Sequence, residues 1–399
     1  MHVDITTFVN PEMGALIDIS GTDSSGVDWN HKAFVPAALP DQSPNLSQRT
    51  YRAVADARAA VAALDSTARQ LPNPTLLRRP TLQREAQSTS ALEGTYAPLE
   101  QVLVADEAAP STVELREILN YVEMANEGIA WIRDGRPITV NFLSDLQGIL
   151  MNGTPLAAAS GRLRDITVVI GQRPDADPLA PAVRRARFVP PPPGDQLEAG
   201  VSSLVGWIRM NHDEEIDPIV AAAMTHYQFE CLHPFRDGNG RLGRFLIMVH
   251  LMLSGVLSEP TLSVSPWFES RRSPYYDALF GVSSRGDWDG FIQFFARGIT
   301  ESARSTRVQM LALVAVQEEL RQTVRDSPLR ADTALMLVDH AVANPSFSVE
   351  SVSETLNVSP NRARKLINQL IELGVLQVAD PLAYKRRYFA PAVLRVLLG

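Results

Sequence analysis

The chain of 399 residues has only one cysteine, Cys231. One cysteine cannot form an intramolecular disulfide, so the composition favours a reducing compartment. No stretch reaches the roughly 18 apolar residues of a membrane span, and no basic region followed by an apolar run opens the N-terminus. The sequence therefore predicts a cytoplasmic protein with no membrane partner.

The chain also lacks an excess of positive charge, because 37 Lys and Arg face 45 Asp and Glu for a formal net charge of −8. This balance argues against a protein that coats nucleic acid over its whole surface, so any such binding must be local. The length suggests two to three domains at about 150 residues each.

One stretch, residues 233–244, gathers several reactive groups in the order His-Pro-Phe-Arg-Asp-Gly-Asn-Gly-Arg-Leu-Gly-Arg. Gly238 and Gly240 flank Asn239, which lets the backbone turn successive N–H groups toward one point and form an anion nest. The apolar pattern predicts a helix from Arg241 to Gly255, whose positive end faces the same turn. The stretch therefore predicts a phosphate site.

The charged residues of this stretch suggest a chemistry. Arg241 and Arg244 lie three residues apart, so both can reach one ligand from neighbouring helix faces. Asp237 is an oxygen donor suited to Mg²⁺, and His233 is largely neutral at pH 7 and can accept a proton. These are the parts of a phosphoryl or nucleotidyl transferase.

The twelve residues resemble the signature of the Fic (Fic/Doc) family, His-Pro-Phe-x-Asp-Gly-Asn-Gly-Arg-x-x-Arg, at every fixed position. The flanking stretches 226–230 and 275–279 are also similar to the family, so the resemblance covers roughly residues 45–310. It implies a mainly α-helical bundle with a β-hairpin flap. The implied activity is transfer of AMP from ATP to a hydroxyl of a target protein.

The resemblance assigns roles to individual residues. His233 would take the proton of a target Ser, Thr or Tyr, and Asp237 would hold Mg²⁺ between the α- and β-phosphates of ATP. The residues that would contact the nucleotide are Gly238, Asn239, Gly240, Arg241, Leu242, Gly243 and Arg244. Tyr275 and Tyr276 would lie near the adenine, with simple packing as the alternative.

A second motif, Thr89-Ser90-Ala91-Leu92-Glu93-Gly94, ends a helix predicted over 80–92. Gly94 fits the left-handed position after a helix, which places Glu93 where the helix dipole disfavours an acid. The motif resembles the inhibitory motif of Fic proteins, Ser or Thr followed after three residues by Glu-Gly. The resemblance implies that Glu93 pairs with Arg244 in the space of the ATP γ-phosphate, and the alternative is a solvated acid.

Two β-type runs, 166–171 and 186–189, predict a hairpin with one open edge. They resemble the Fic flap, in which Val169, Ile170 and Gly171 would hold the target segment as an added strand. An ordinary surface hairpin is the alternative. The connection of 14 residues, 172–185, is long enough to be mobile.

The helical patterns define the remaining organisation. We expect an extended arm over 1–44, an N-terminal helical region over 45–110, a catalytic core over 111–310 and a separate module over 330–399. Further helices are predicted from Leu46 to a stop at Leu71, and over 113–133, 140–152, 197–210, 217–232, 274–282 and 289–305.

The C-terminal module resembles a winged helix-turn-helix. Helices are predicted over 333–342, 349–356 and 360–373, followed by strands over 375–378 and 384–389. Residues 360–395 carry seven basic and two acidic side chains. The candidate DNA contacts are Arg362, Arg364, Lys365, Arg386 and Arg387, and the alternative is a packing or dimerisation module.

Several functional alternatives stay open at this stage. The same residues could remove AMP from a modified protein, with Glu93 orienting a water. The chain could instead be a DNA-bound regulator whose enzymatic site is mostly silent, and phosphate or phosphocholine could be the transferred group. The target, self-modification and a homodimer are equally undecided.

Overall fold

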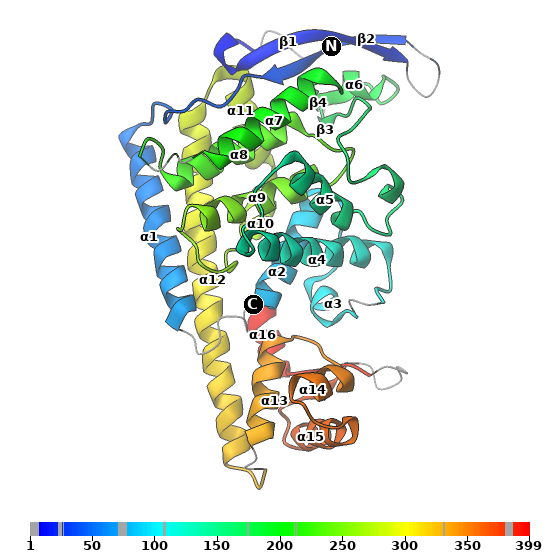
Figure 1. The fold of residues 1–399 in the computed structure, drawn as a ribbon, viewed down its shortest axis with the longest axis vertical. Helices are drawn as coiled ribbons and strands as arrows, with labels where there is room; N and C mark the ends of the chain where they lie inside the picture. The colour runs from blue at the N-terminus through cyan, green and yellow to red at the C-terminus, as the bar shows by residue number, and fades with distance from the viewer. Residues whose placement is uncertain are drawn as a thin grey trace.

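The computed structural model describes residues 8–22, 26, 28–70, 78–106, 109–173, 175–210, 212, 214–329, 332–379 and 386–399. It is a mainly helical molecule (Figure 1). The helices of the N-terminal half are α1 Gln48–Gln70, α2 Arg78–Leu92, α3 Leu99–Val104, α4 Val113–Arg133, α5 Val140–Leu150, α6 Ala182–Arg185 and α7 Asp195–Arg209. Those that follow are α8 Pro218–Leu232, α9 Asn239–Leu253, α10 Ser265–Glu269, α11 Arg272–Arg285, α12 Trp288–Arg325, α13 Asp332–Ala343, α14 Val349–Thr355, α15 Pro360–Glu372 and α16 Pro391–Leu398. Two short 3₁₀ turns are Pro11–Met13 and Ala157–Ala159.

The long helix α12 runs through most of the molecule, with α1 packed along it (Figure 1). The predicted helix over 289–305 is too short, because α12 continues to Arg325. Its apolar side chains keep the helical spacing beyond 305, and Met310, Leu313 and Val324 are buried. The predicted core limit at 310 therefore falls inside a helix that the core and the C-terminal module share. None of the described helices combines the length and apolar composition of a membrane span.

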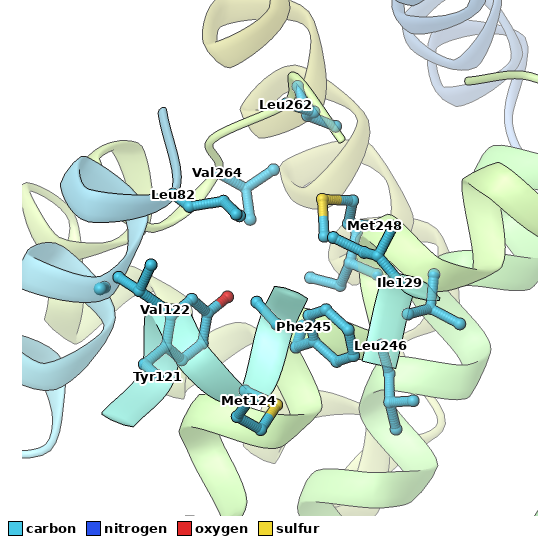
Figure 2. Packing of buried hydrophobic residues seen from close by; sticks show 14 of the residues in the cluster. Leu82, Tyr121, Val122, Met124, Ile129, Phe245, Leu246, Met248, Leu262 and Val264 are labelled. Carbon is cyan, nitrogen blue, oxygen red and sulfur yellow. The ribbon is translucent and has the colours of Figure 1, made fainter. Parts of the chain in front are cut away.

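The core that positions the signature lies between α2, α4 and α9 (Figure 2). Tyr121, Met124 and Ile129 of α4 and Phe245 and Leu246 of α9 line this core, and all are buried. The close approach of α4 to α9 depends on Gly128, because a Cβ at that position would lie 2.8 Å from the Phe245 ring. Helices α8 and α9 are both buried on nearly every side, so the loop that joins them is fixed at both ends.

Helix α2 is held in this core by polar groups. The buried carboxylate of Glu85 accepts hydrogen bonds from the Ser263 hydroxyl (2.8 Å) and from the Ser265 amide (3.0 Å) and hydroxyl (2.5 Å). A buried acid that is satisfied this way ties its helix firmly to its neighbour. Glu93, which follows α2, is therefore carried by a fixed element.

The predicted N-terminal arm is a β-hairpin rather than an extended segment. β1 Gly14–Thr22 pairs antiparallel with β2 Asp28–Pro36. The polar and glycine-rich composition of β1 hid the strand pattern. Backbone and side-chain hydrogen bonds tie the segment to the core through Ser284, Gln228 and Trp207.

The predicted flap hairpin is present but shorter than expected. β3 Ile170–Gln172 pairs with β4 Ala186–Phe188, with Ile170 opposite Phe188. Residues 166–169 precede the strand, and the connection ends in the short helix α6. The N-terminal hairpin supports the flap from behind, where Ala33, Ala186 and Val189 pack together and the Phe34 amide donates to the Val189 carbonyl at 2.9 Å.

The C-terminal module contains α13, α14, α15 and the antiparallel pair β5 Gln377–Val378 and β6 Tyr388–Phe389. Both strands are shorter than predicted, and residues 384 and 385 lie outside the described residues. Ser359 caps α15 as predicted, by accepting from the Arg362 amide. The final helix α16, which the sequence did not predict, returns to the core (Figure 1), where Arg84 of α2 donates to the Leu397 carbonyl at 3.2 Å.

One predicted DNA contact of this module, Arg387, is engaged within the protein. Arg387 is half-buried and donates to the hydroxyl and carbonyl of Ser346, and it forms an ion pair with Asp106 at 3.4 Å. Its guanidinium group therefore ties the module to the core. Arg362, Arg364, Lys365 and Arg386 are exposed.

Candidate active site

The loop after α8 starts with a residue in an unusual backbone conformation. His233 is left-handed (φ 46°, ψ 60°), which a residue with a Cβ seldom adopts unless its surroundings enforce it. Its amide donates to the Phe229 carbonyl at 3.0 Å, and its own carbonyl accepts from Arg164 Nε at 2.8 Å. Phe235 is fully buried and anchors the loop in the core.

Asn239 closes this loop instead of facing a ligand. Its Oδ1 accepts from the Phe235 amide and its Nδ2 donates to the Phe235 carbonyl, both at 2.8 Å. Both polar groups of the side chain are thus occupied within the loop. The side chain of Asn239 therefore holds the loop, and the predicted contact of Asn239 with the nucleotide stays a prediction.

The anion site is the first turn of α9, which begins at Asn239, two residues earlier than predicted. Gly238 is left-handed (φ 82°) as expected, but Gly240 is helical. Position 240 needs a glycine for a different reason, because a Cβ there would lie 1.9 Å from Glu93 Oε1. The Glu93 carboxylate therefore lies against the positive end of α9, where the helix dipole favours an anion.

Arg244 binds both ends of the predicted inhibitory motif. Its NH2 group lies 2.6 Å from Glu93 Oε1 and 3.0 Å from the Thr89 carbonyl, and its Nε donates to Thr89 Oγ1 at 2.6 Å. The Arg244 side chain is fully buried, and that of Glu93 is 29% exposed. Gly94 is left-handed (φ 96°), as the helix end requires.

The electrostatics of this pair favour the charged forms. Burial raises the pKa of Glu93, but the charge and the hydrogen bond of Arg244 outweigh it, so the net pKa lies below the ordinary value. The same carboxylate helps to raise the pKa of Arg244 despite its burial. Glu93 is therefore ionised at neutral pH, and the site already holds an anion.

The predicted convergence of Arg241 and Arg244 on one ligand stays a prediction, and the structure shows other contacts for Arg241. It is buried between two acids, with NH2 3.3 Å from Asp237 Oδ1 and NH1 3.6 Å from Glu117 Oε2. The second acid fixes Arg241 on the α4 side of the loop.

Asp237 remains available to a metal ion. Its side chain is 43% exposed, and its Oδ1 accepts hydrogen bonds from the Gly238 amide and Arg241. Among the described residues no group of three or more His, Cys, Asp or Glu could enclose a metal. This donor set fits Mg²⁺, which commonly binds one carboxylate together with substrate phosphates and waters.

An open cavity of about 440 Å³ adjoins Glu93 and His233. Val169, Ile170 and Gly171 of the predicted flap line one wall, and α11 forms the opposite wall with Tyr276. The lining of the cavity also includes four apolar side chains, those of Leu92, Phe188, Leu279 and Phe280. The cavity thus brings the predicted base, the inhibitory acid and the flap together.

Tyr275, which was predicted beside the nucleotide with Tyr276, points into the core instead. It is fully buried, and its hydroxyl lies 2.8 Å from His226 Nε2. Leu242 is also fully buried in the core. Tyr276 lies at the cavity, and its hydroxyl donates to the Leu92 carbonyl at 3.3 Å.

His233 is poised as a proton acceptor. Burial lowers its pKa to about 4, although Glu93 and Asp237 act in the opposite direction. The imidazole is therefore neutral at pH 7 while still lining the cavity. His226 and His250, interpreted as core residues, are buried with pKa values lowered by burial to about 3 and about 4.

Two residues that shape the site were missed. Arg164 is buried and donates to the carbonyls of His233, Ile166, Pro191 and Leu232. Glu230 lines the cavity beside Glu93. Glu230 falls in the stretch 226–230 that resembled the family, but its position on an apolar helix gave no sign of a role, and Arg164 stood in an unpatterned loop.

The Glu93 pair predicts a pH-dependent stability. Because the folded pKa of Glu93 is lowered, its stabilisation is present above the ordinary value of 4.5 and is lost as the pH falls through the folded value. At pH 7 we expect Glu93→Gln to lower the free energy of unfolding by about 1–2 kcal/mol. Denaturant unfolding at pH 7 and at pH 3.5–4 should show this difference shrinking, and a difference independent of pH would contradict the ion pair.

Comparisons with known proteins agree with this geometry. The Fic/DOC family model matches residues 137–251, and the Fic/DOC family N-terminal model matches residues 51–130. Protein adenylyltransferase Fic of Nematostella vectensis is 31% identical over 184 residues, which are 46% of this chain and 36% of that protein. Protein adenylyltransferase Fic of Culex quinquefasciatus is 37% identical over 108 residues, 27% and 20% respectively.

The chain thus spans only 20% to 36% of the length of these curated relatives. A solved Fic family protein from Desulfovibrio desulfuricans G20 superposes with a TM-score of 0.55 at 22% identity, covering 88% of this chain and 98% of that one. The two chains share the fold. Residues 51–130 and 137–251, which include the complete signature, thus form a Fic/DOC region within this chain.

Proposed function

We propose that the chain is an autoinhibited protein adenylyltransferase, which transfers AMP from ATP to a hydroxyl group of a target protein. The observation that carries the proposal is the combination of a neutral imidazole at the cavity, His233, with an anion site on α9 that a displaceable acid, Glu93, occupies. The curated relatives bearing the name protein adenylyltransferase support it.

In this reaction the ATP phosphates take the place of the Glu93 carboxylate at Gly240 and Arg244. The target oxygen attacks the α-phosphorus and passes its proton to His233, while the bond to the β-phosphate oxygen breaks and pyrophosphate leaves. Mg²⁺ held by Asp237 would neutralise phosphate charge. The protein contributes positioning of the reactants and stabilisation of charge. These two effects can account for most of the reduction in the activation free energy of phosphoryl transfer.

The flap offers a way to hold a target. Within the described part of the chain, β3 pairs only with β4, so its outer edge is open to an added strand. Binding through main-chain groups makes little demand on target sequence, and the N-terminal hairpin behind the flap keeps its edge in place. The apolar wall with Tyr276 and Phe280 suits the adenine ring.

Replacing His233 tests the base. His233→Ala should abolish transfer of label from α-³²P-ATP to protein, a loss of at least about 10²-fold, because it removes the imidazole that accepts the proton in the proposed mechanism. The assay is best run in a Glu93→Gly background so that the starting rate is measurable. Transfer at the unmodified rate would remove His233 from this role.

Replacing Glu93 tests the inhibition. Glu93→Gly should raise self-modification well above wild type, because Arg244 and the first turn of α9 become free for phosphate. Intact mass after incubation with ATP and Mg²⁺ measures the effect and identifies the transferred group from the added mass. Glu198→Gly, at an exposed acid on α7, is the matched control. A rate equal to or below wild type would contradict autoinhibition.

A second candidate function is local DNA binding by the C-terminal module. The exposed cations Arg362, Arg364 and Lys365 lie together on α15, the third helix of the predicted winged helix-turn-helix. Replacing all three with Ala should weaken a mobility shift of duplex DNA in about 0.15 M salt by at least tenfold. Replacing the exposed Arg49, Arg52 and Arg304 is the control, and equal losses in both triple variants would mean nonspecific attraction.

A further inference from the structure

Glu230 is a second acid at the same anion site, and the mechanism above does not use it. It lies on α8, three residues before His233, and its side chain lines the cavity with Glu93. Its Oε1 atom is buried and has no hydrogen-bond partner within the part of the chain that the structure describes. A buried polar atom without a hydrogen-bond partner at a ligand cavity is expected to form its hydrogen bond with the ligand.

Helix α9 leaves space for the carboxyl groups of both Glu93 and Glu230 by carrying a glycine opposite each of them. A Cβ at Gly243 would lie 2.5 Å from Glu230 Oε1, as a Cβ at Gly240 would lie 1.9 Å from Glu93 Oε1. Gly240, Gly243 and Arg244 are spaced at i, i+3 and i+4, so they share one face of α9. The two carboxyl groups therefore lie on the face of α9 that carries Arg244.

One guanidinium group cannot hold two ionised acids equally well. Glu93 has the direct contact with Arg244, whereas burial raises the pKa of Glu230 to about 8, with Arg244 opposing and Glu93 adding to the shift. Glu230 is therefore mostly a neutral acid at pH 7, with a proton to donate.

We propose that Glu230 is a nucleotide-binding residue: once Glu93 has left Arg244, its neutral carboxyl group donates a hydrogen bond to the phosphate that replaces Glu93. This inference rests on the proposed function, because it needs a nucleotide phosphate at that position. An ionised Glu230 would instead repel the phosphate across a buried site. ATP affinity should therefore decline as Glu230 loses its proton.

The other groups around Glu230 do not complicate its titration. Those that interact with it electrostatically are Glu93 after α2, Arg244 of α9, Tyr275 and Tyr276 of α11 and Cys231 of α8. The pKa values of both tyrosines are raised above 10, and burial raises that of Cys231 to about 12. His233 and His226 on the same helix, with pKa values of about 4 and about 3, stay neutral. Removing Glu93 removes a like charge, which lowers the pKa of Glu230.

The test compares Glu93→Gly with Glu93→Gly/Glu230→Gln in binding of a fluorescent ATP analogue with Mg²⁺ from pH 6 to 9. We expect the Kd of Glu93→Gly to rise about tenfold or more across this range, since each pH unit above the pKa weakens binding by a factor of about ten. Glutamine cannot ionise and still donates a hydrogen bond, so the Kd of the double variant should change much less. Ionisation of ATP affects both proteins equally. Glu93→Gly/Glu198→Gln is the control and should keep the steep profile.

The outcomes separate this inference from the proposed function. Parallel pH profiles in the two variants would overturn the role of Glu230 alone, whereas absence of nucleotide binding at every pH would overturn the proposed function and this inference with it. Calorimetry of ATP binding to Glu93→Gly at pH 8, in buffers of different ionisation enthalpy, needs no change at position 230. We expect uptake of a proton on binding, and zero uptake would refute the inference even if Glu230→Gln failed to fold.

Discussion

The ion pair between Glu93 and Arg244 at the first turn of α9 is the contact on which the site depends. Arg244 comes from a helix that is buried on nearly every side, and Glu93 follows a helix that the buried Glu85 ties to its neighbours. Neither helix can move without disrupting the core, so the carboxylate is the part of the pair that can be displaced. Because it already lies where an anion is stabilised, the site is organised for a phosphate before one arrives.

The conformation of the loop between α8 and α9 is held by residues that have no role in the proposed reaction. A left-handed conformation at His233 costs on the order of 1–3 kcal/mol, which the surroundings must offset. Arg164 offsets it by binding four backbone carbonyls around the loop, and Asn239 by closing the loop onto Phe235. The orientation of the imidazole is therefore a property of the whole fold.

The sequence predicted which residues meet at the site better than what each one does there. The signature and the motif around Glu93 identified the Arg244 pair because short, specific patterns carry their geometry with them. Spacing on a helix does not say where a side chain points, so the sequence did not predict the contacts of Tyr275, Asn239 and Arg241. Their partners are His226, Phe235 and the acids Asp237 and Glu117. Long-range packing also hid the N-terminal hairpin and the full length of α12.

The same long-range packing connects the C-terminal module to α2, the helix that precedes Glu93. Arg79 and Arg84 of α2 donate to Asn344 and to the Leu397 carbonyl, and Ser346 donates to the Val104 carbonyl after α2. These contacts join the module to α2, which carries Thr89 and precedes Glu93, while α12 packs against α13 and α16 of the module (Figure 1). Arg387 serves this docking, which leaves α15 as the cationic face of the module. A ligand bound on α15 would therefore bind a module that contacts α2 directly.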